Sequence, residues 1–151
     1  MRTIFVSVFT VLFSGMLLNC TSANTHISKD ANLSAGIQRE WMLTSFEGYA
    51  KADLIRNNAN INLTEKAEHE KIKGTAFAGC NNMFFTAEFK NDGKVKISEI
   101  GSTLKACQDM KLENDFSKQL RNVTQYSVKG HFLILTDDQG HTMEFIAADW
   151  D

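Results

Sequence analysis

Apolar and polar residues alternate in short runs through most of the chain after residue 39, which is typical of half-buried β-strands. The expected strands cover residues 40–46, 60–64, 72–78, 83–89, 95–98, 132–135 and 141–146. Turn sequences separate several of these runs, Asn91-Asp92-Gly93-Lys94 and Asp137-Asp138-Gln139-Gly140 among them. Because such turns favour tight hairpins, the pattern predicts an antiparallel sheet.

One segment has the period of a helix instead. Leu112, Phe116, Leu120 and Val123 recur at intervals of three or four residues, which places them on one face of an α-helix. Asp109 is the expected N-cap, because a carboxylate there can accept hydrogen bonds from the first backbone N–H groups. The sequence therefore predicts one amphipathic helix packed on the sheet.

The first twenty residues have the features of an export signal. Arg2 precedes an apolar run, residues 4–18, that is short for a membrane span. Leu17-Leu18-Asn19-Cys20 resembles a bacterial lipobox, so we expect residues 1–19 to be removed and Cys20 to be lipidated. Ordinary cleavage after Ala23, and a retained membrane anchor, are the alternatives.

The expected organisation is a signal peptide over residues 1–19, a flexible linker over residues 20–37 and one domain over residues 38–151. The linker is polar and contains no Phe, Trp or Tyr, so it lacks the apolar surface that a folded segment would bury. Thr21 after Cys20 resembles the outer-membrane sorting pattern of Gram-negative lipoproteins. We expect a lipid-anchored protein of the cell envelope that faces the periplasm; a soluble periplasmic or secreted protein is the alternative.

Composition limits the function. The chain of 151 residues carries 16 basic and 18 acidic side chains, and removal of the signal takes away only Arg2. The basic residues are scattered, so no nucleic-acid partner is expected. No Gly-x-Ser-x-Gly elbow, His-Glu-x-x-His or phosphate loop is present, and we expect no enzymatic activity and no cofactor.

No metal site is expected either. Neighbours in Glu68-His69-Glu70 do not share one side of a strand or of a helix. In the last hairpin, His131 and His141 would lie on the order of 16 Å apart, since each pairing position adds about 3.3 Å.

Three cysteines are present, and Cys20 lies at the signal boundary. Cys80 and Cys107 are then the only cysteines inside the domain of an exported chain, which predicts a disulfide between them. Two buried free thiols are the alternative. The absence of a Cys-X-X-Cys sequence argues against a redox-active pair.

Residues around these cysteines carry a resemblance to a known family. They are Gly79, Cys80, Asn81, Thr103, Ala106 and Cys107, followed by Glu113, Phe116, Leu120, Val123, Tyr126, Gly130, Leu133, Leu135, Gly140 and Phe145, with Trp41 and Leu43 upstream. With these residues the region 38–147 resembles the META/HslJ domain. The resemblance implies an α+β fold: a compact antiparallel β-sheet or partial barrel of about seven to eight strands with one packed α-helix.

The resemblance also implies a class of function. Proteins with this domain include exported lipoproteins linked to heat or envelope stress, and no enzymatic activity is established for the family in general. We therefore expect a non-catalytic envelope lipoprotein that supports stress tolerance or binds an envelope protein. Gly79, Asn81, Thr103 and Ala106 would have structural roles, with Asn81 and Thr103 satisfying buried backbone groups at a corner.

The alternative is a carrier of a lipid or another apolar segment, or an assembly lipoprotein similar to secretin pilots. In a carrier, Phe84, Phe85 and Phe89 would line the wall of an apolar cavity, although aromatic residues in a strand are also ordinary core candidates.

Overall fold

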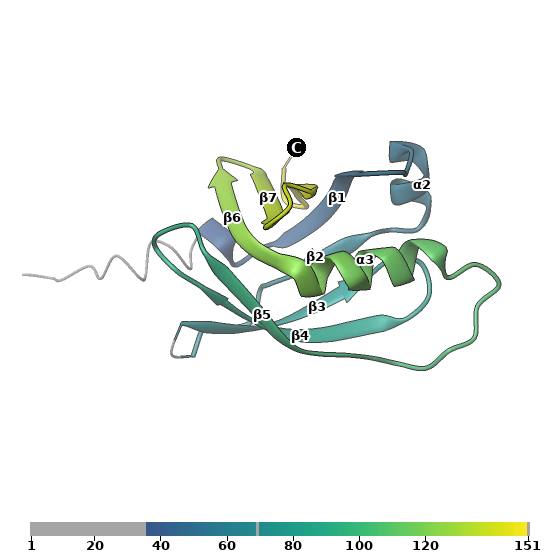
Figure 1. Ribbon diagram of the computed structural model, residues 1–151, viewed down its shortest axis with the longest axis horizontal. Helices are drawn as coiled ribbons and strands as arrows, with labels where there is room; N and C mark the ends of the chain where they lie inside the picture. The colour runs from purple at the N-terminus through teal and green to yellow at the C-terminus, as the bar shows by residue number, and fades with distance from the viewer. Residues whose placement is uncertain (1–35, 69, 151) are drawn as a thin grey trace, which may run out of the picture.

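The computed structural model describes residues 36–68 and 70–150. Eight antiparallel strands form one sheet, and two helices lie in its connections (Figure 1). The strands are β1 (Glu40–Phe46), β2 (Asn60–Asn62), β3 (Lys71–Phe77), β4 (Asn82–Phe89), β5 (Val95–Ser102), β6 (Val123–Lys129), β7 (Phe132–Asp137) and β8 (Thr142–Ala147). The helices are α2 (Lys51–Arg56) and α3 (Lys111–Asn122).

The sheet curls into a nearly closed barrel. Its strand order is β5-β4-β3-β2-β1-β8-β7-β6, so β5 and β6 are its two edges. These edges meet where Lys94 and Gln125 form an isolated bridge, and the Tyr126 N–H donates to the Gly93 carbonyl oxygen at 2.8 Å. The predicted fold class is confirmed: an antiparallel partial barrel with a packed helix, to which the structure adds the short α2.

Inward-facing side chains fill the barrel. Trp41 is fully buried, and its indole N–H donates to the Ile37 carbonyl oxygen at 2.9 Å. Helix α3 adds Leu112, Phe116 and Leu120 to this core, as its spacing predicted. The Phe116 ring meets the Phe46 ring edge to face, with centroids 6.4 Å apart. Residues from the first strand and from α3 thus share one core.

The structure differs from the prediction at both ends of α3. Helix α3 begins at Lys111 after Met110, so Asp109 is not its N-cap, although Asp109 Oδ1 accepts a hydrogen bond from the Lys111 N–H at 2.9 Å. Val123 belongs to the predicted helical face but is the first residue of β6. Strand β6 follows α3 directly, and Val123 is buried in line with the apolar stripe of the helix.

The antiparallel order places the connections at two ends of the barrel. The chain enters β1 at one end, here called the entry end, which also holds the β4–β5 and β6–β7 turns and the end of β8. The opposite end, here called the far end, holds the β3–β4 corner and the connection 103–110. Figure 1 shows the β4–β5 turn at the left and the connection 103–110 at the right.

Candidate functional site

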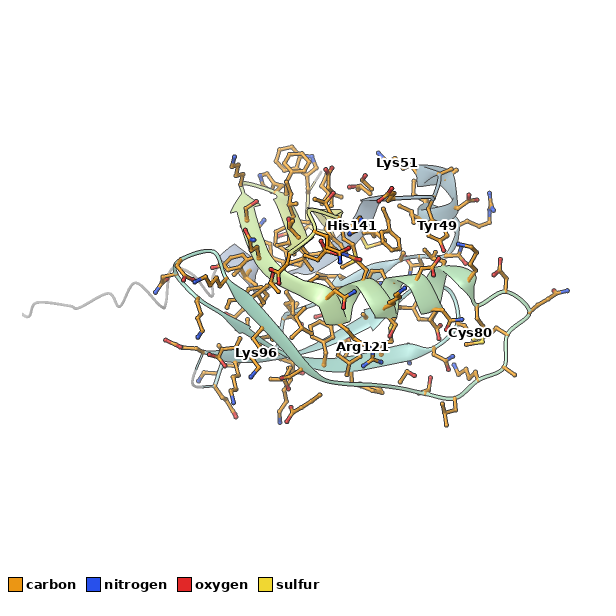
Figure 2. The ribbon with its side chains drawn as sticks, viewed as in Figure 1. Tyr49, Lys51, Cys80, Lys96, Arg121 and His141 are labelled. Atoms are coloured by element: carbon orange, nitrogen blue, oxygen red, sulfur yellow. A yellow bond between two sulfur atoms is a disulfide. The ribbon has the colours of Figure 1, made fainter. Side chains whose placement is uncertain are left out.

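A disulfide fixes the connection between β5 and α3, residues 103–110, here called the stapled loop. Cys80 follows β3 and is buried, whereas Cys107 lies exposed in the loop. The two are bonded, with their Cα atoms 6.1 Å apart, as the cysteine count predicted. Figure 2 shows Cys80 at the far end, near the start of α3. The bridge joins the β3–β4 corner to the loop.

Asn81 binds the same loop through hydrogen bonds. Its side-chain oxygen accepts from the Thr103 hydroxyl at 2.8 Å and from the Lys105 N–H at 2.7 Å. Its side-chain nitrogen donates to the Lys105 carbonyl oxygen at 3.2 Å. Thr103 Oγ1 in turn accepts from the Asn82 N–H at 3.2 Å. Asn81 and Thr103 thus hydrogen-bond backbone groups of Lys105 and Asn82, two exposed residues.

Glu113 completes this arrangement from the first turn of α3. It is buried, and its two carboxylate oxygens accept from the Asn81 side-chain nitrogen, at 2.8 Å, and from the Asn81 backbone N–H. A buried carboxylate requires such partners, and the helix N-terminus also favours its negative charge. Sequence reasoning did not assign this pairing. The available signal was an acid three residues before Phe116, on the buried face of the helix.

The other two motif residues differ in their surroundings. Gly79 has φ of 109°, and a Cβ atom there would lie 2.5 Å from Asn57 Oδ1, so the position requires glycine. Ala106 lies exposed in the stapled loop, and nothing in the structure explains why alanine stands there.

The stapled loop presents one large apolar side chain to solvent. Leu104 is 97% exposed, and it lies between Thr103 and Lys105, which both hydrogen-bond to the Asn81 side chain. The backbone on each side of Leu104 is therefore held in place. The fixed backbone therefore carries an apolar side chain outside the core.

The predicted aromatic wall is wrong as a set. Successive side chains of a strand point to opposite faces of the sheet, and Phe84 is 49% exposed while Phe85 and Phe89 are buried. Phe85 packs over Gly74, where an added Cβ atom would come within 2.4 Å of its ring. Phe89 lies edge to face against Tyr126, with ring centroids 4.9 Å apart. Phe85 and Phe89 therefore belong to the packed core.

A polar cluster holds the start of α3 against the β1–α2 connection. The Tyr49 hydroxyl donates to Asp115 Oδ2 at 2.6 Å, and Lys111 Nζ donates to the same oxygen at 2.7 Å. The hydrogen bond from Lys111, followed by that from Tyr49, lowers the pKa of Asp115. Burial and the bond to Asp115 raise the pKa of Tyr49. Both shifts keep the cluster in this hydrogen-bonded form.

A second cluster closes the β7–β8 turn. Asp137 is buried, and Oδ1 accepts from the Gln139 and His141 N–H groups, each at 2.9 Å. Its Oδ2 contacts His141 Nδ1 at 2.9 Å and accepts from Gln119 Nε2 at 3.1 Å. Burial alone would raise the pKa of Asp137, but the hydrogen bonds from His141 and Gln119 hold it below its usual value. The bond to Asp137 raises the pKa of His141.

The two histidines predicted to lie apart have separate partners. His131 contacts Arg39 and Trp150, whereas His141 contacts Asp137. Within residues 36–68 and 70–150, no group of three or more His, Cys, Asp or Glu side chains could hold a metal ion. His69 and the expected lipidation site Cys20 lie outside the described residues. Neither helix of the described part is long and apolar enough to cross a membrane.

Comparison with known proteins identifies the family. The family model of the META domain matches residues 31–150. No curated protein sequence matches the chain. A protein from Burkholderia xenovorans, solved by NMR, has a TM-score of 0.62 and 18% identity, over 80% of this chain and 89% of its own.

Two further solved structures have the same fold. A second protein solved by NMR has a TM-score of 0.55 and 20% identity, over 82% of this chain and 97% of its own. A DUF4847 family protein from Bacteroides vulgatus, solved by crystallography, has a TM-score of 0.52 and 17% identity, over 76% of this chain and 95% of its own. At these identities the structural likeness concerns the fold alone. On the match of the family model over residues 31–150, the chain belongs to the META domain family.

Proposed function

We propose that this protein is a non-catalytic lipoprotein of the cell envelope that binds an envelope protein through its stapled loop. In this proposal residues 1–19 direct export, Cys20 carries the lipid, and the META domain faces the periplasm. Support of stress tolerance would follow from the bound partner rather than from a reaction.

The exposure of Leu104 in a fixed loop carries the proposal. An exposed apolar side chain contributes most to binding when its backbone is already in the bound conformation, because less conformational entropy is then lost. Cys80, through the disulfide, and Asn81, through its hydrogen bonds, hold the loop from the same corner. The backbone that carries Leu104 is thus already ordered before any partner arrives.

The disulfide also supports export. Disulfides persist in oxidising compartments such as the bacterial periplasm and are rare in the reducing cytosol. A bridge between Cys80 and Cys107 therefore agrees with a signal peptide over residues 1–19. The carrier alternative has less support, because Phe85 and Phe89 are part of the packed core.

Binding through the loop is tested by site-specific photocrosslinking in cells that produce the protein. A photoreactive amino acid at position 104 should give one discrete adduct, while the same amino acid at Ile55, which is 64% exposed on α2, should not. The protein in the adduct, once identified and purified, should bind the wild-type chain and lose affinity for Leu104→Ser. Equal adducts at both positions, or unchanged affinity of Leu104→Ser, would refute binding through the loop.

Lipidation is tested separately. Cells supplied with labelled palmitate should incorporate the label into the wild-type chain and not into Cys20→Ala. Absence of label in the wild-type chain would refute the anchor without affecting the result for the loop.

A further inference from the structure

Two exposed aromatic side chains lie at the entry end of the barrel. Phe132, the first residue of β7, is 53% exposed, and Trp150, shortly after β8, is 49% exposed. The Trp150 ring rests on the ring of His131, with centroids 3.6 Å apart, and His131 directly precedes Phe132. These three residues, His131, Phe132 and Trp150, are here called the aromatic rim.

The aromatic rim continues over the outer face of the sheet. Phe132 is paired with the half-buried Ile146 of β8, and Ile146 is paired with the half-buried Met42 of β1. Side chains of directly paired residues lie on the same face of an antiparallel sheet. Apolar surface therefore continues from Phe132 along the outer face of the sheet, across β8 to β1.

The rim lies where the chain enters the domain. Arg39, immediately before β1, approaches His131 Nδ1 with its Nη1 at 3.4 Å and Asp149 Oδ1 at 3.8 Å. The chain that leads from Cys20 thus joins the barrel beside the rim. The expected linker, residues 20–37, is too long at its end, because Ile37 is buried in the core and its carbonyl oxygen accepts from Trp41. The remaining sixteen positions, residues 20–35, would span roughly 20 to 25 Å as a flexible segment.

Cationic side chains stand next to the aromatic rim. Lys129 is paired with Phe132 across the β6–β7 turn, and it has no carboxylate partner among the described residues. Lys90 and Lys94 belong to the neighbouring β4–β5 turn. The Tyr126 hydroxyl of β6 donates to the Lys90 carbonyl oxygen at 2.7 Å and so holds this turn beside β6. Both lysines have a carboxylate partner: Lys90 lies 3.6 Å from Glu88, and Lys94 lies 3.3 Å from Asp92. Lys129 is therefore the cation most available to an anionic group.

We propose that the aromatic rim rests on the headgroup layer of the membrane that anchors the protein, with Lys129 on the phosphate of an anionic phospholipid. The inference rests on the proposed lipidation of Cys20. Tryptophan favours this layer because its indole combines an apolar ring with a polar N–H, phenylalanine adds apolar contact at the boundary with the acyl chains, and lysine is attracted by the negative charge of the headgroups. A short tether raises the local concentration of the rim at the surface to about the millimolar range, so weak contacts suffice.

This orientation agrees with the proposed role of the stapled loop. The strand order places the rim and the stapled loop at opposite ends of the barrel. Figure 1 shows the β6–β7 turn at the upper left and the connection 103–110 at the right. With the entry end on the membrane, the far end and its exposed Leu104 lie on the side away from the bilayer, where partners in the periplasm can reach them.

The test uses a tether that does not depend on lipidation in the cell. Because Cys80 and Cys107 are bonded to each other, the unlipidated mature chain has one free thiol, Cys20. This thiol is coupled to a maleimide lipid in vesicles of phosphatidylethanolamine and phosphatidylglycerol. A fraction of the lipids carries bromine on the acyl chain, which quenches nearby tryptophan. Trp41 is fully buried and serves as the internal reference for Trp150.

Brominated lipid should quench Trp150 in the wild-type chain and leave the emission of Trp41, seen alone in Trp150→Phe, unchanged. The quenching should be lost in Phe132→Ser and reduced in Lys129→Glu. Phe84→Ser is the matched control, since Phe84 is similarly exposed but lies near the start of β4, toward the far end. In this variant the lipid should quench Trp150 as strongly as in the wild-type chain.

Two results would overturn the proposal: Trp150 quenched no more by brominated than by plain lipid, or equal loss of quenching in Phe84→Ser and Phe132→Ser. Neither result depends on whether Cys20 is lipidated in cells, which palmitate labelling decides. If Trp150 is not quenched but palmitate labels Cys20, the proposed contact of the rim is wrong and the proposed function still stands.

Discussion

Asn81 and Glu113 are joined by two hydrogen bonds across 32 residues of sequence: the backbone N–H of Asn81 and its side-chain amide each donate to a different carboxylate oxygen. Both residues are buried, and the other polar atom of the Asn81 side chain, Oδ1, accepts two hydrogen bonds from the stapled loop. One side chain therefore connects the β3–β4 corner, the loop and α3.

Substitution of Asn81 by aspartate should strongly destabilise the fold. It would put a second carboxylate beside buried Glu113 and remove the side-chain donor, leaving only the backbone N–H of residue 81. Breaking a buried charged pair in this way costs about 3–5 kcal/mol. Glu113→Gln should cost less, about 1–3 kcal/mol, because one acceptor oxygen remains. Urea unfolding at neutral pH measures both, with the exposed Glu144→Gln as the control. A cost for Asn81→Asp no larger than that of the control would contradict this role.

The pairing illustrates what sequence alone could and could not show. The hairpins and α3 were predictable because their signals are local: alternation, a glycine turn or a helical stripe. The partner of Glu113 is set by how α3 docks, so its local sequence suggested only a favourable charge at a helix start. Helix α2 was missed because it has six residues and buries only Leu54, which leaves no period to detect. Strand β6 was missed because Val123 also fits the helical stripe.

The disulfide should stabilise the domain mainly by limiting its unfolded state. For a closed loop of the 27-residue separation seen here, the chain-entropy model gives about 3.5 kcal/mol. The variant Cys80→Ser with Cys107→Ser should therefore unfold at lower urea concentration than the oxidised wild-type chain. Amide hydrogen exchange should rise first in the stapled loop, because the hydrogen bonds to Asn81 then hold it alone. Equal urea midpoints for the double variant and the oxidised wild-type chain would show that the disulfide does not stabilise the domain.

Gly79 should be far less tolerant of alanine than Gly101. At Gly79 a Cβ atom would meet Asn57 and the backbone has φ of 109°, whereas a Cβ atom at Gly101 meets nothing within 4 Å. We expect Gly79→Ala to cost more than about 1 kcal/mol, since the strain adds to the usual penalty of the left-handed region. Thermal unfolding of the two variants, side by side, gives the comparison. Similar melting temperatures would show that the corner relaxes.

The pair of Asp137 and His141 should make stability depend on pH. The pKa of His141 is raised in the folded state, chiefly by its hydrogen bond to Asp137 and further by the charges of Asp137 and Glu47. Its contribution is therefore complete below the unfolded value of about 6.5 and is lost as the pH rises through the folded value. The pKa of Asp137 is lowered, so its contribution is present above about 3.9 and is lost on further acidification.

Stability attributable to the pair should then be greatest between about pH 4 and 6.5. Urea unfolding of the wild-type chain and of His141→Gln at pH 5.5 and pH 8.5 measures it. The difference between the two proteins should be larger at pH 5.5. NMR titration of the His141 ring gives its pKa directly, and Asp137→Asn should return that pKa toward its ordinary value. A difference that grows toward alkaline pH would contradict the pairing.

Leu104 should contribute little to the stability of the domain. Surface substitutions away from special backbone positions usually change stability by no more than about 0.5 kcal/mol, and Leu104 is almost fully exposed. Leu104→Ser should therefore unfold as the wild-type chain does while losing the proposed partner. A marked loss of stability would mean that the side chain packs on the domain, and the proposed function would lose its main support.

The position of the disulfide also bears on how the chain acquires its fold. Cys80 precedes β4 and Cys107 follows β5, so the two thiols come together only after that hairpin has paired. The β4–β5 register contains an irregularity between Phe84 and Thr86, and a hairpin slipped by one residue would carry the thiols apart. Oxidation therefore favours chains whose hairpin is already in register. The covalent bond thus records correct pairing of β4 with β5.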